Sequence, residues 1–311
     1  MSTEKKVLIF GAGGFVGSYL TKEFYENGYD VYGSDMHEIK NSSFFQKTVI
    51  ADLTDSQAID DVCKMLNPDI IVNLAAISSV GLSWRMPQKT MQVNIIGALN
   101  VLDAAKSMTE SPKVLLIGSS EEYAPSSLPL TEKDSIDATN PYGISKLAQE
   151  RLAEAYEKQY GMRIYRTRSF NHTGVGQLET FVLASWCKQV AEIEKSGEAG
   201  VLRVGNIDVK RDFSDVRDVV RAYRVLVESD YYGTVFNVCS GNAITLRSLA
   251  EEISSLCAQD VTIIRDSNLS RAVDNPVICG DLTKTKQLLG WEPKYCIYDT
   301  LKEMYEYYLQ K

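Results

Sequence analysis

Histidine is scarce in this sequence, and its cysteines are not paired. Only His37 and His172 are present, so a metal site built on histidine ligands is not expected. The six cysteines lie far apart and form no Cys-x-x-Cys pair, which in a chain of this length indicates reduced, mostly buried thiols. We therefore expect neither a bound metal nor a framework of disulfides.

An excess of positive charge and long apolar runs are also lacking. The net charge of −8 at pH 7 argues against a nucleic-acid partner, which requires a basic face, although an acidic chain can still bind a nucleotide locally. No apolar run approaches the roughly 18 residues that a membrane span needs. The chain starts without the layout of a signal peptide. The sequence therefore predicts a cytoplasmic protein with no nucleic-acid or membrane partner.

The first half of the chain alternates short apolar runs with amphipathic stretches. Such alternation is typical of β-α-β units, which form a parallel sheet with helices on both faces. The sequence therefore predicts an α/β fold. The expected strands cover residues 7–10, 30–33, 48–51, 70–74, 114–117 and 163–167, and the expected helices cover residues 16–27, 56–66, 91–106 and 141–160.

After about residue 168 the pattern becomes less regular, with more polar and glycine-bearing connections. No linker rich in proline and serine separates the two halves, so a second domain would pack tightly on the first. The helices expected here cover residues 180–195, 216–228, 246–257, 282–289 and 300–310, and the strands cover residues 200–204, 235–238 and 261–264.

A cluster of glycines follows the first predicted strand and opens the first predicted helix. Gly11 permits a tight turn, Gly14 lets the backbone approach a pyrophosphate, and Gly17 allows close contact between helix and strand. The amino terminus of the helix stabilises the bound anion. In this strand–turn–helix context the glycines predict a dinucleotide-binding site.

Asp35, at the end of the second strand, extends this prediction. A carboxylate at that position accepts hydrogen bonds from the adenosine ribose and repels a 2′-phosphate, which favours NAD(H) over NADP(H). Lys40 lies close enough in sequence to keep NADP(H) open. The other residues expected to contact the cofactor are Phe15, Val16, Asp52, Leu53, Leu74, Ala75, Ala76 and Phe170.

Three further residues suggest a catalytic group. Tyr142 and Lys146 are spaced i, i+4, which places both side chains on one helix face. An ammonium beside a phenol is expected to lower the phenol pKa from about 10, so that Tyr142 can exchange a proton near neutral pH. Lys146 can also hold the nicotinamide ribose. Ser119 follows the fifth strand at the sheet edge where α/β proteins bind ligands, and its hydroxyl could polarise the same substrate oxygen.

Together these motifs resemble the extended short-chain dehydrogenase/reductase family. The resemblance spans almost the whole chain and implies a Rossmann-type doubly wound sheet, a smaller α/β substrate-binding domain and a homodimer. Residues 1–168 would form the dinucleotide-binding domain and residues 169–311 mainly the substrate-binding domain, with segments around 206–240 returning to the first. The motifs are Gly11-x-x-Gly14-x-x-Gly17, Leu74-Ala75-Ala76, Val93-Asn94, Ser119, Tyr142-x-x-x-Lys146, Gly280-Asp281 and Leu289-Gly290-Trp291-Glu292-Pro293.

Within that family, several stretches are most similar to the branch that acts on GDP-mannose and its derivatives. The resemblance implies NAD(P)H-dependent reduction of the C4 keto group of a GDP-linked 6-deoxy sugar, converting GDP-4-dehydro-6-deoxy-D-mannose to GDP-D-rhamnose. The alternatives are 4,6-dehydration of GDP-mannose with a retained cofactor and 4-epimerisation of a nucleotide sugar. The stretches are residues 118–123, 170–174, 205–218 and 237–241.

The same resemblance implies roles for individual residues. Glu121 corresponds to a glutamate that removes a proton in the dehydratases and that also occurs in the reductases, so its presence leaves both activities open. Ala124 departs from the family, which often has glycine there, and Ser270-Arg271-Ala272 departs from the Leu-Arg-Pro of many reductases. His172 is expected to be a hydrogen-bonded structural residue. The residues expected to bind the substrate are Ser119, Asn171, Lys188, Arg211, Arg271 and Asp274, with both arginines on the diphosphate and Asp274 near the ribose.

Overall fold

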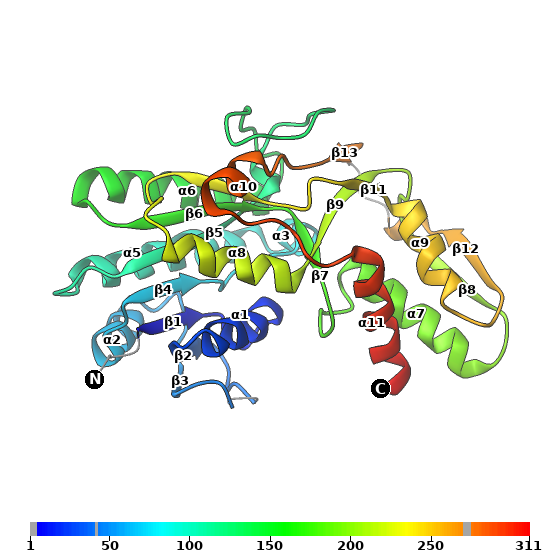
Figure 1. Ribbon diagram of the computed structural model, residues 1–311, viewed down its shortest axis with the longest axis horizontal. Helices are drawn as coiled ribbons and strands as arrows, with labels where there is room; N and C mark the ends of the chain where they lie inside the picture. Colours follow the sequence, from blue (N-terminus) through cyan, green and yellow to red (C-terminus); the bar gives the residue numbers. More distant parts are fainter. Residues whose placement is uncertain (1–4, 41–42, 270–274) are drawn as a thin grey trace.

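The computed structural model describes residues 5–40, 43–269 and 275–311. All structural statements below refer to these residues. Arg271 and Asp274, which are expected to bind the substrate, lie outside them, as does the departure at residues 270–272. Figure 1 shows a larger part built on a central sheet and, on the right of the view, a smaller part of helices and short strands.

The larger part is a parallel sheet of seven strands in the order β10-β6-β5-β4-β1-β2-β3. All its neighbouring strands run parallel, as predicted. The Rossmann-type α/β fold class is therefore confirmed. The strands are β1 (Lys6–Phe10), β2 (Asp30–Asp35), β3 (Lys47–Ile50), β4 (Ile70–Asn73), β5 (Lys113–Ser119), β6 (Ile164–Ser169) and β10 (Val235–Val238).

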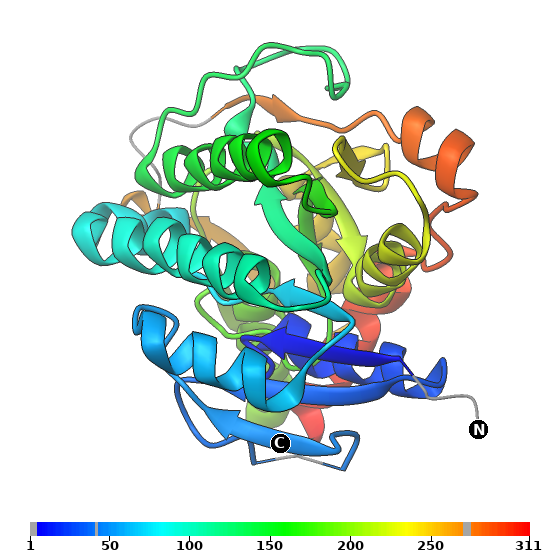
Figure 2. The same ribbon diagram turned by 90° about the vertical axis from the view of Figure 1, so that its left-hand side faces the viewer.

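Helices cover both faces of this sheet, as Figure 2 shows. Alternate residues of a strand point to opposite faces, so Val7 and Ile9 of β1 belong to one core cluster and Leu8 and Phe10 to another. Burial of both faces explains why the inner strands read as almost continuous apolar runs. The first core includes α1 (Phe15–Glu26) and α8 (Val216–Glu228), and the second includes α2 (Ser56–Leu66), α5 (Gly97–Ser107) and α6 (Pro141–Tyr160).

The smaller part has its own hydrophobic core between three helices and short strands. Strand β9 (Lys210–Asp215) pairs with β7 (Asn171–Thr173), β11 (Ala243–Thr245) and β13 (Val277–Ile278). The helices α7 (Val182–Ser196), α9 (Leu246–Ser255) and α11 (Ile297–Gln310) pack together beside the β8 (Gly200–Val204) and β12 (Val261–Arg265) pair.

The chain passes between the two parts more than once. After β9 it returns to the larger part, where α8 packs against α1 and β10 pairs with β6. Helix α10 (Thr283–Leu289) then packs near β10 before α11 ends in the smaller part. The larger sheet therefore draws on residues well beyond 168, whereas the domain boundary expected there remains a prediction.

Many predicted elements are confirmed with the same bounds, including α2, α6, α8, β8 and β10. The single helix predicted over residues 91–106 is divided in the structure. The structure has α4 (Pro87–Met91), a π-helical turn (Gln92–Ile96) and then α5. In the π-helical turn the buried Asn94 accepts a hydrogen bond from the Ile77 N–H and donates one to the Ser145 hydroxyl. Helix α3 (Val80–Arg85) and strand β9 were not predicted.

Two kinds of feature are absent from the described residues. None of the described helices is both long enough and apolar enough to cross a lipid bilayer. No group of three or more histidine, cysteine, aspartate or glutamate side chains is arranged there to hold a metal ion. Four of the cysteines are buried thiols.

Candidate active site

The predicted site residues gather at one edge of the large sheet. In a parallel sheet the carboxyl ends of all strands meet at the same edge, where α/β proteins bind ligands. Gly11 directly follows β1, Asp35 ends β2, Leu74 follows β4 and Ser119 ends β5. Ser119 also lies opposite Ser169 of β6 in the strand register. The sheet therefore brings the cofactor motif and the catalytic motif together, although they are far apart in sequence.

The glycine turn after β1 leaves no space for side chains at two positions. Gly11 has a φ of 79°, and a Cβ built on it would lie 2.7 Å from the Ala75 amide nitrogen. A Cβ on Gly17 would lie 2.4 Å from the Gly11 carbonyl oxygen. Because these contacts are with backbone atoms, the neighbours cannot give way. The turn therefore holds α1 tightly against β1 and the residues after β4.

The amino terminus of α1 suits an anion. Its N-cap is Gly14, no side chain caps the helix, and its first turn carries no acidic residue. Gly13 and Gly14 are exposed. The first amide groups and the positive end of the helix dipole are thus left for a ligand. This arrangement fits the pyrophosphate of a dinucleotide, the group that the glycine motif predicts.

Asp35 lies directly beside this turn. Its carboxylate accepts hydrogen bonds from the Gly13 N–H at 3.0 Å and the His37 N–H at 3.3 Å. A negative charge is therefore held next to the place where the adenosine ribose is expected. This position supports the preference for NAD(H) that the sequence predicts.

The other residues expected to contact the cofactor follow the strands at this edge or open α1. One of them, Phe170, has a ring that is buried away from any ligand. Asp52 accepts hydrogen bonds from the N–H and the hydroxyl of Thr54, which hold its pKa below the usual range. Leu53 is buried against Gly97. Phe170 is 2% exposed in a cluster with Tyr123 and Cys239, so its ring offers no surface to a ligand and any contact must come from its backbone. The remaining residues, Phe15, Val16, Leu74, Ala75 and Ala76, are half-buried.

Ser119 opens a short 3₁₀ turn, Ser120–Glu122, at the end of β5. Its hydroxyl accepts a hydrogen bond from the Glu121 N–H at 3.2 Å, and its own N–H donates to Glu122 Oε1 at 2.6 Å. These bonds accompany a capping box, in which the Ser119 side chain also accepts the Glu122 N–H. They fix Ser119 at the sheet edge, where it is almost completely buried.

Tyr142 and Lys146 lie in the first turns of α6, as the spacing predicts. Asn140 caps this helix by accepting a hydrogen bond from the Gly143 N–H at 2.9 Å, and Pro141 occupies its first turn. The Tyr142 N–H donates to the Ser83 hydroxyl at 3.2 Å. Lys146 Nζ donates to the Ile117 carbonyl at 2.7 Å, which ties the helix to β5 beside Ser119.

The pKa of Tyr142 differs from the expected direction. Burial raises it above its ordinary value, the charges of Glu122 and Glu121 raise it further, and a hydrogen bond with Ser119 lowers it only in part. Burial lowers the pKa of Lys146 to about 8, and the Glu122 charge acts in the opposite direction. The expected lowering of the Tyr142 pKa by Lys146 was wrong, because desolvation dominates and the ammonium points to the Ile117 carbonyl. Tyr142 is therefore a protonated phenol at neutral pH.

Glu121 lies next to the start of α6 and is half-buried. Its Oε2 accepts a hydrogen bond from the Asn140 side-chain amide at 2.8 Å. Asn140 thus caps the helix with one side-chain atom and holds Glu121 with the other. The glutamate is positioned at the site, close to Tyr142, and is bound to a neighbouring side chain.

Three of the residues expected to bind the substrate, Asn171, Lys188 and Arg211, come from the smaller part. Asn171 of β7 and Arg211 of β9 lie on neighbouring strands, with Asn171 opposite Phe213. Arg211 is buried, and its Nη1 donates to the carbonyl oxygens of Lys210 and Asn275 at 2.8 and 2.7 Å. Asn171 and Arg211 therefore lie in the strands that lead away from the carboxyl edge of the large sheet.

Two other residues of this part are already paired. Lys188 on α7 forms an ion pair with Glu179 at 2.7 Å, so its ammonium group is already paired with a carboxylate of the chain. His172 pairs through Nδ1 with the Phe170 carbonyl at 3.0 Å, and burial lowers its pKa, which keeps the ring neutral. The structural role expected for His172 agrees with these contacts.

Sequence reasoning did not single out Asp212 as a key residue. Its buried carboxylate accepts hydrogen bonds from the Ser240 N–H and hydroxyl, the Gly241 N–H and the Gly280 N–H, at 2.6 to 3.1 Å. These donors come from segments that are distant in sequence. Asp212 thus joins β9, next to Arg211, to the chain that follows β10 and to the chain that follows β13.

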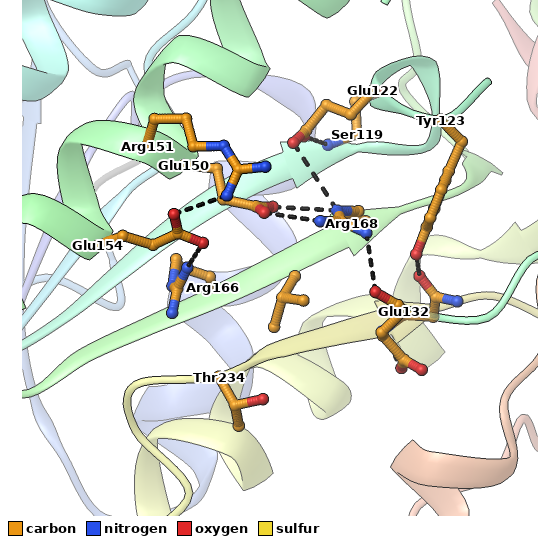
Figure 3. Close-up of polar contacts among 12 residues, drawn as sticks. Ser119, Glu122, Tyr123, Glu132, Glu150, Arg151, Glu154, Arg166, Arg168 and Thr234 are labelled. Atoms are coloured by element: carbon orange, nitrogen blue, oxygen red, sulfur yellow. Dashed lines mark hydrogen bonds and ion pairs between the residues drawn. The ribbon is translucent and has the colours of Figure 1, made fainter. Parts of the chain in front are cut away.

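A buried ionic cluster behind Ser119 was also missed. Glu122, Glu150 and Arg168 lie together between β6 and α6 (Figure 3). Arg168 directly follows the strand expected over residues 163–167, and the structure includes it in β6. A charged residue next to a predicted strand was the available signal, because in a buried strand it requires a partner.

The chain matches the family model described as GDP-mannose 4,6 dehydratase over residues 8–304. It is 35% identical over 254 residues to the GDP-6-deoxy-D-mannose reductase of Pseudomonas aeruginosa, covering 81% of this chain and 83% of the relative. It is 27% identical over 349 residues to a GDP-mannose 4,6-dehydratase of Yersinia enterocolitica, covering 96% and 92%.

Solved structures give a similar result. The structure of RMD from Pseudomonas aeruginosa complexed with NADPH is 30% identical, with a TM-score of 0.86 over 99% of this chain and 98% of that one. A UDP-glucose 4-epimerase from Thermotoga maritima with UDP-glucose is 26% identical, with a TM-score of 0.88 over 98% and 99%. The similarity thus extends over both parts of the molecule.

Proposed function

The chain belongs to the GDP-mannose 4,6-dehydratase family of NAD(P)-dependent sugar-nucleotide enzymes, and we propose that it reduces the C4 keto group of a GDP-linked 6-deoxy sugar. The substrate would be GDP-4-dehydro-6-deoxy-D-mannose and the product GDP-D-rhamnose. The observation that carries the proposal is the position of Tyr142, whose phenol is hydrogen-bonded to Ser119 at the carboxyl edge of the sheet. A reductase needs a proton donor there, and the similarity to a reductase agrees with this direction.

In the proposed reaction the carbonyl becomes an alcohol by gaining a hydride and a proton. The hydride for C4 would come from NAD(P)H held at the glycine turn. The Ser119 hydroxyl polarises the C4 oxygen, and the Tyr142 phenol donates the proton to that oxygen. Lys146, which lies one turn from Tyr142 on the same helix and donates to the Ile117 carbonyl, would anchor the nicotinamide ribose.

We assign the cofactor to the glycine turn on the basis of its fit. Gly11 and Gly17 leave no space for side chains, and the uncapped amino terminus of α1 supplies amide donors for the pyrophosphate. Asp35 would bind the adenosine ribose.

The diphosphate of the substrate would be bound by arginine, because its planar group matches phosphate oxygens. Arg211 is the candidate among the described residues, and Arg271 is a second candidate outside them. Asn171 and Lys188 would assist, and Lys188 would have to leave Glu179 to do so. Asp274 would lie near the ribose.

Dehydration of GDP-mannose is the second candidate function, because Glu121 lies at the site and dehydratases are among the relatives. In that reaction Glu121 would act as the base at C5, and no added cofactor would be consumed. A 4-epimerase would also regenerate its cofactor but would change only stereochemistry.

Mass spectrometry separates these activities. The purified protein is incubated with GDP-mannose alone, and separately with GDP-4-dehydro-6-deoxy-D-mannose plus NADH or NADPH. A gain of two hydrogen masses on the keto sugar, with oxidation of the cofactor, is expected. Loss of water from GDP-mannose without added cofactor would assign the dehydratase, and no change in either mixture would overturn the assignment of the sugar nucleotide.

The homodimer and the cytoplasmic location are also proposals. Large apolar side chains on and directly after α3 are exposed, with Trp84 at 62% and Met86 at 45%, and a second copy of the chain would cover them. Light scattering coupled to gel filtration measures this directly. A monomer mass across the micromolar range would contradict the dimer.

A further inference from the structure

Three charged side chains are buried together directly behind Ser119. Glu122, Glu150 and Arg168 are exposed by 0%, 4% and 2%. The Arg168 guanidinium forms a two-pronged contact with Glu150, from Nη2 at 2.6 Å and from Nε at 3.0 Å. Glu122 Oε2 lies 3.9 Å from Arg168 Nε (Figure 3). Arg168 thus has one carboxyl bound closely and a second one beside it.

Glu122 also holds the backbone of the catalytic serine. Its Oε1 accepts the Ser119 N–H at 2.6 Å. A Cβ on Gly118 would lie 2.5 Å from the same oxygen, so the glycine at that position is what allows the carboxyl to come so close. The other oxygen, Oε2, is buried and makes no hydrogen bond within the part of the chain that the structure describes.

The charges of this cluster do not balance if both carboxyls are ionised. Two carboxylates and one guanidinium leave one net negative charge on these three buried side chains, which is costly. Lys146 is a further cation whose charge interacts with Glu122, but its ammonium donates to the Ile117 carbonyl and not to a carboxyl of the cluster. Burial raises the pKa of Glu122 well above its usual range, and the like charge of Glu150 raises it further. The Ser119 N–H and Arg168 act in the opposite direction. Retaining one proton makes the cluster neutral.

The groups around Glu122 come from every element packed against it. Around Glu122 lie five groups that are charged or titratable: Tyr142, Lys146 and Glu150 of α6, Arg168 of β6 and Glu121 of the 3₁₀ turn. Ser119 of β5 bonds to Glu122 through its N–H. Of these, the Lys146 ammonium donates to the Ile117 carbonyl, and Arg168 bonds closely to Glu150 while its Nε lies 3.9 Å from Glu122 Oε2.

We propose that the Glu122–Glu150 pair retains one proton at neutral pH and that Glu122, kept in this neutral cluster, is a positioning residue for Ser119. The carboxyl oxygen that accepts the Ser119 N–H fixes the turn and hence the direction of the serine hydroxyl. An ionised Glu122 would place a negative charge near Tyr142, which then holds its proton more tightly. The kinetic part of this inference rests on the proposed reduction, whereas the retained proton does not.

The kinetic test compares two substitutions of similar size. In E122L the Ser119 N–H loses its acceptor, and we expect kcat to fall by about 100-fold with little change in the KM for the sugar. In E122Q the amide oxygen accepts the same N–H and the cluster stays neutral, so most of the lost rate is expected to return. Equal losses in the two variants, or no loss in E122L, would overturn the positioning role.

The chain offers a matched control on the same helix. Glu157 is a largely buried carboxyl on α6 that pairs with Arg166, and burial raises its pKa to about 7. E157Q removes a comparable carboxyl at a second ion pair that has no contact with Ser119. It is expected to leave kcat unchanged. A loss in E157Q equal to that in E122L would mean that any carboxyl in this layer supports activity only through the fold.

The retained proton is tested without any substrate. Infrared difference spectra at neutral pH should show a protonated-carboxyl component that is lost in both E122Q and E150Q. The same component should remain in E157Q, in which only the separate contribution of Glu157, whose pKa is about 7, is removed. Unfolding gives a second readout. If a carboxyl keeps its proton in the folded protein, the fold becomes less stable as the pH rises above the pKa of that carboxyl in the unfolded chain. The Tm of the wild type should therefore fall relative to that of E122Q between pH 5 and 8.

The retained proton and the proposed reduction can be contradicted independently of each other. Absence of the infrared band together with a pH-independent Tm difference would overturn the retained proton, whatever the enzyme reduces. If band and Tm behave as expected but no GDP-linked keto sugar is reduced, the proposed function fails and the buried pair stands.

Discussion

The edge of the large sheet and the strand β9 hold their functional residues by different means. At the sheet edge, a short run of glycines fits against backbone atoms of β1 and of the chain after β4. At β9, the buried Asp212 binds donors that lie 28 to 68 residues away in sequence. The first arrangement depends on the local absence of side chains, and the second on long-range pairing of a buried charge. Mutations in the two regions should therefore separate cofactor binding, chemistry and sugar binding.

The largest effect is expected at the catalytic helix of the sheet edge. Tyr142→Phe removes the proposed proton donor, and kcat should fall by about 10³-fold while cofactor binding persists. Tyr160→Phe on the same helix, whose ring is exposed, is the matched control and should leave kcat unchanged. Steady-state kinetics measures both. A Tyr142→Phe enzyme with wild-type kcat would remove the tyrosine from the mechanism.

The glycine turn should respond next, and only in cofactor binding and stability. A Cβ at Gly17 meets backbone oxygen at 2.4 Å, so Gly17→Ala should cost about 1–3 kcal/mol and weaken NAD(P)H binding by at least about tenfold. Gly81→Ala is the control, since its Cβ would meet nothing closer than 3.9 Å. Fluorescence titration of NAD(P)H tests the pair. Similar affinities for the two variants would contradict the steric account.

The opposite pattern is expected at β9. Asp212→Asn replaces a charged acceptor by a weaker one, which should cost about 1–3 kcal/mol of stability and raise the KM for the sugar nucleotide. The affinity for NAD(P)H should stay the same. Asp208→Asn, at an exposed ion pair with Arg247, serves as the control. If Asp212→Asn weakened the cofactor and the sugar equally, the two regions would not be separable in this way.

A smaller change is expected in the choice of cofactor. Asp35→Ser removes the negative charge beside the glycine turn, so the ratio of kcat/KM for NADPH over NADH should rise by about tenfold, equivalent to about 1.4 kcal/mol. Kinetics with both cofactors gives the ratio. A wild-type preference for NADPH, or an unchanged ratio in the variant, would show that Asp35 does not set the choice.

A last effect concerns the pH dependence of stability and not activity. Burial lowers the pKa of Lys146 to about 8 in the folded protein, whereas an unfolded lysine titrates at about 10.4. Between these two pKa values the unfolded state binds more protons than the folded state. The free energy of unfolding should therefore increase as the pH rises from 8 to 10.4, and this gain is lost as the pH falls to 8. Denaturant unfolding of wild type and Lys146→Met measures the difference. A difference that is constant from pH 7 to 10 would contradict the burial of the charge.

The parts of the fold that were predictable share one property. Helices such as α2 and α6 carry an amphipathic pattern with capping residues, Asp55 and Asn140, so their bounds followed from local signals. Strand β9 carries no such pattern, because nearly all of Lys210–Asp215 is buried although most of it is polar. Its partners β7, β11 and β13 are only two or three residues long. A short strand of polar residues is stabilised by its partners and not by its own sequence.

The candidate site divides in the same way. The spacing of Gly11, Gly14 and Gly17, and that of Tyr142 and Lys146, indicated their roles, since each spacing is realised within one turn or one helix. The sequence could not predict that Lys188 pairs with Glu179 or that the Phe170 ring is buried. Both depend on which distant segments pack beside them.

By itself, the sequence determined the parallel α/β sheet, the glycine turn, and the placement of Ser119 at the end of one strand and Tyr142 at the start of the following helix. Those features follow from hydrophobic periodicity and from steric requirements that act over a few residues. Only the tertiary structure decided that Tyr142 keeps its proton, that Asp212 joins three segments and that Glu122 and Glu150 share one guanidinium. Protonation and charge pairing depend on burial, and burial is set by residues that meet only when the chain is folded.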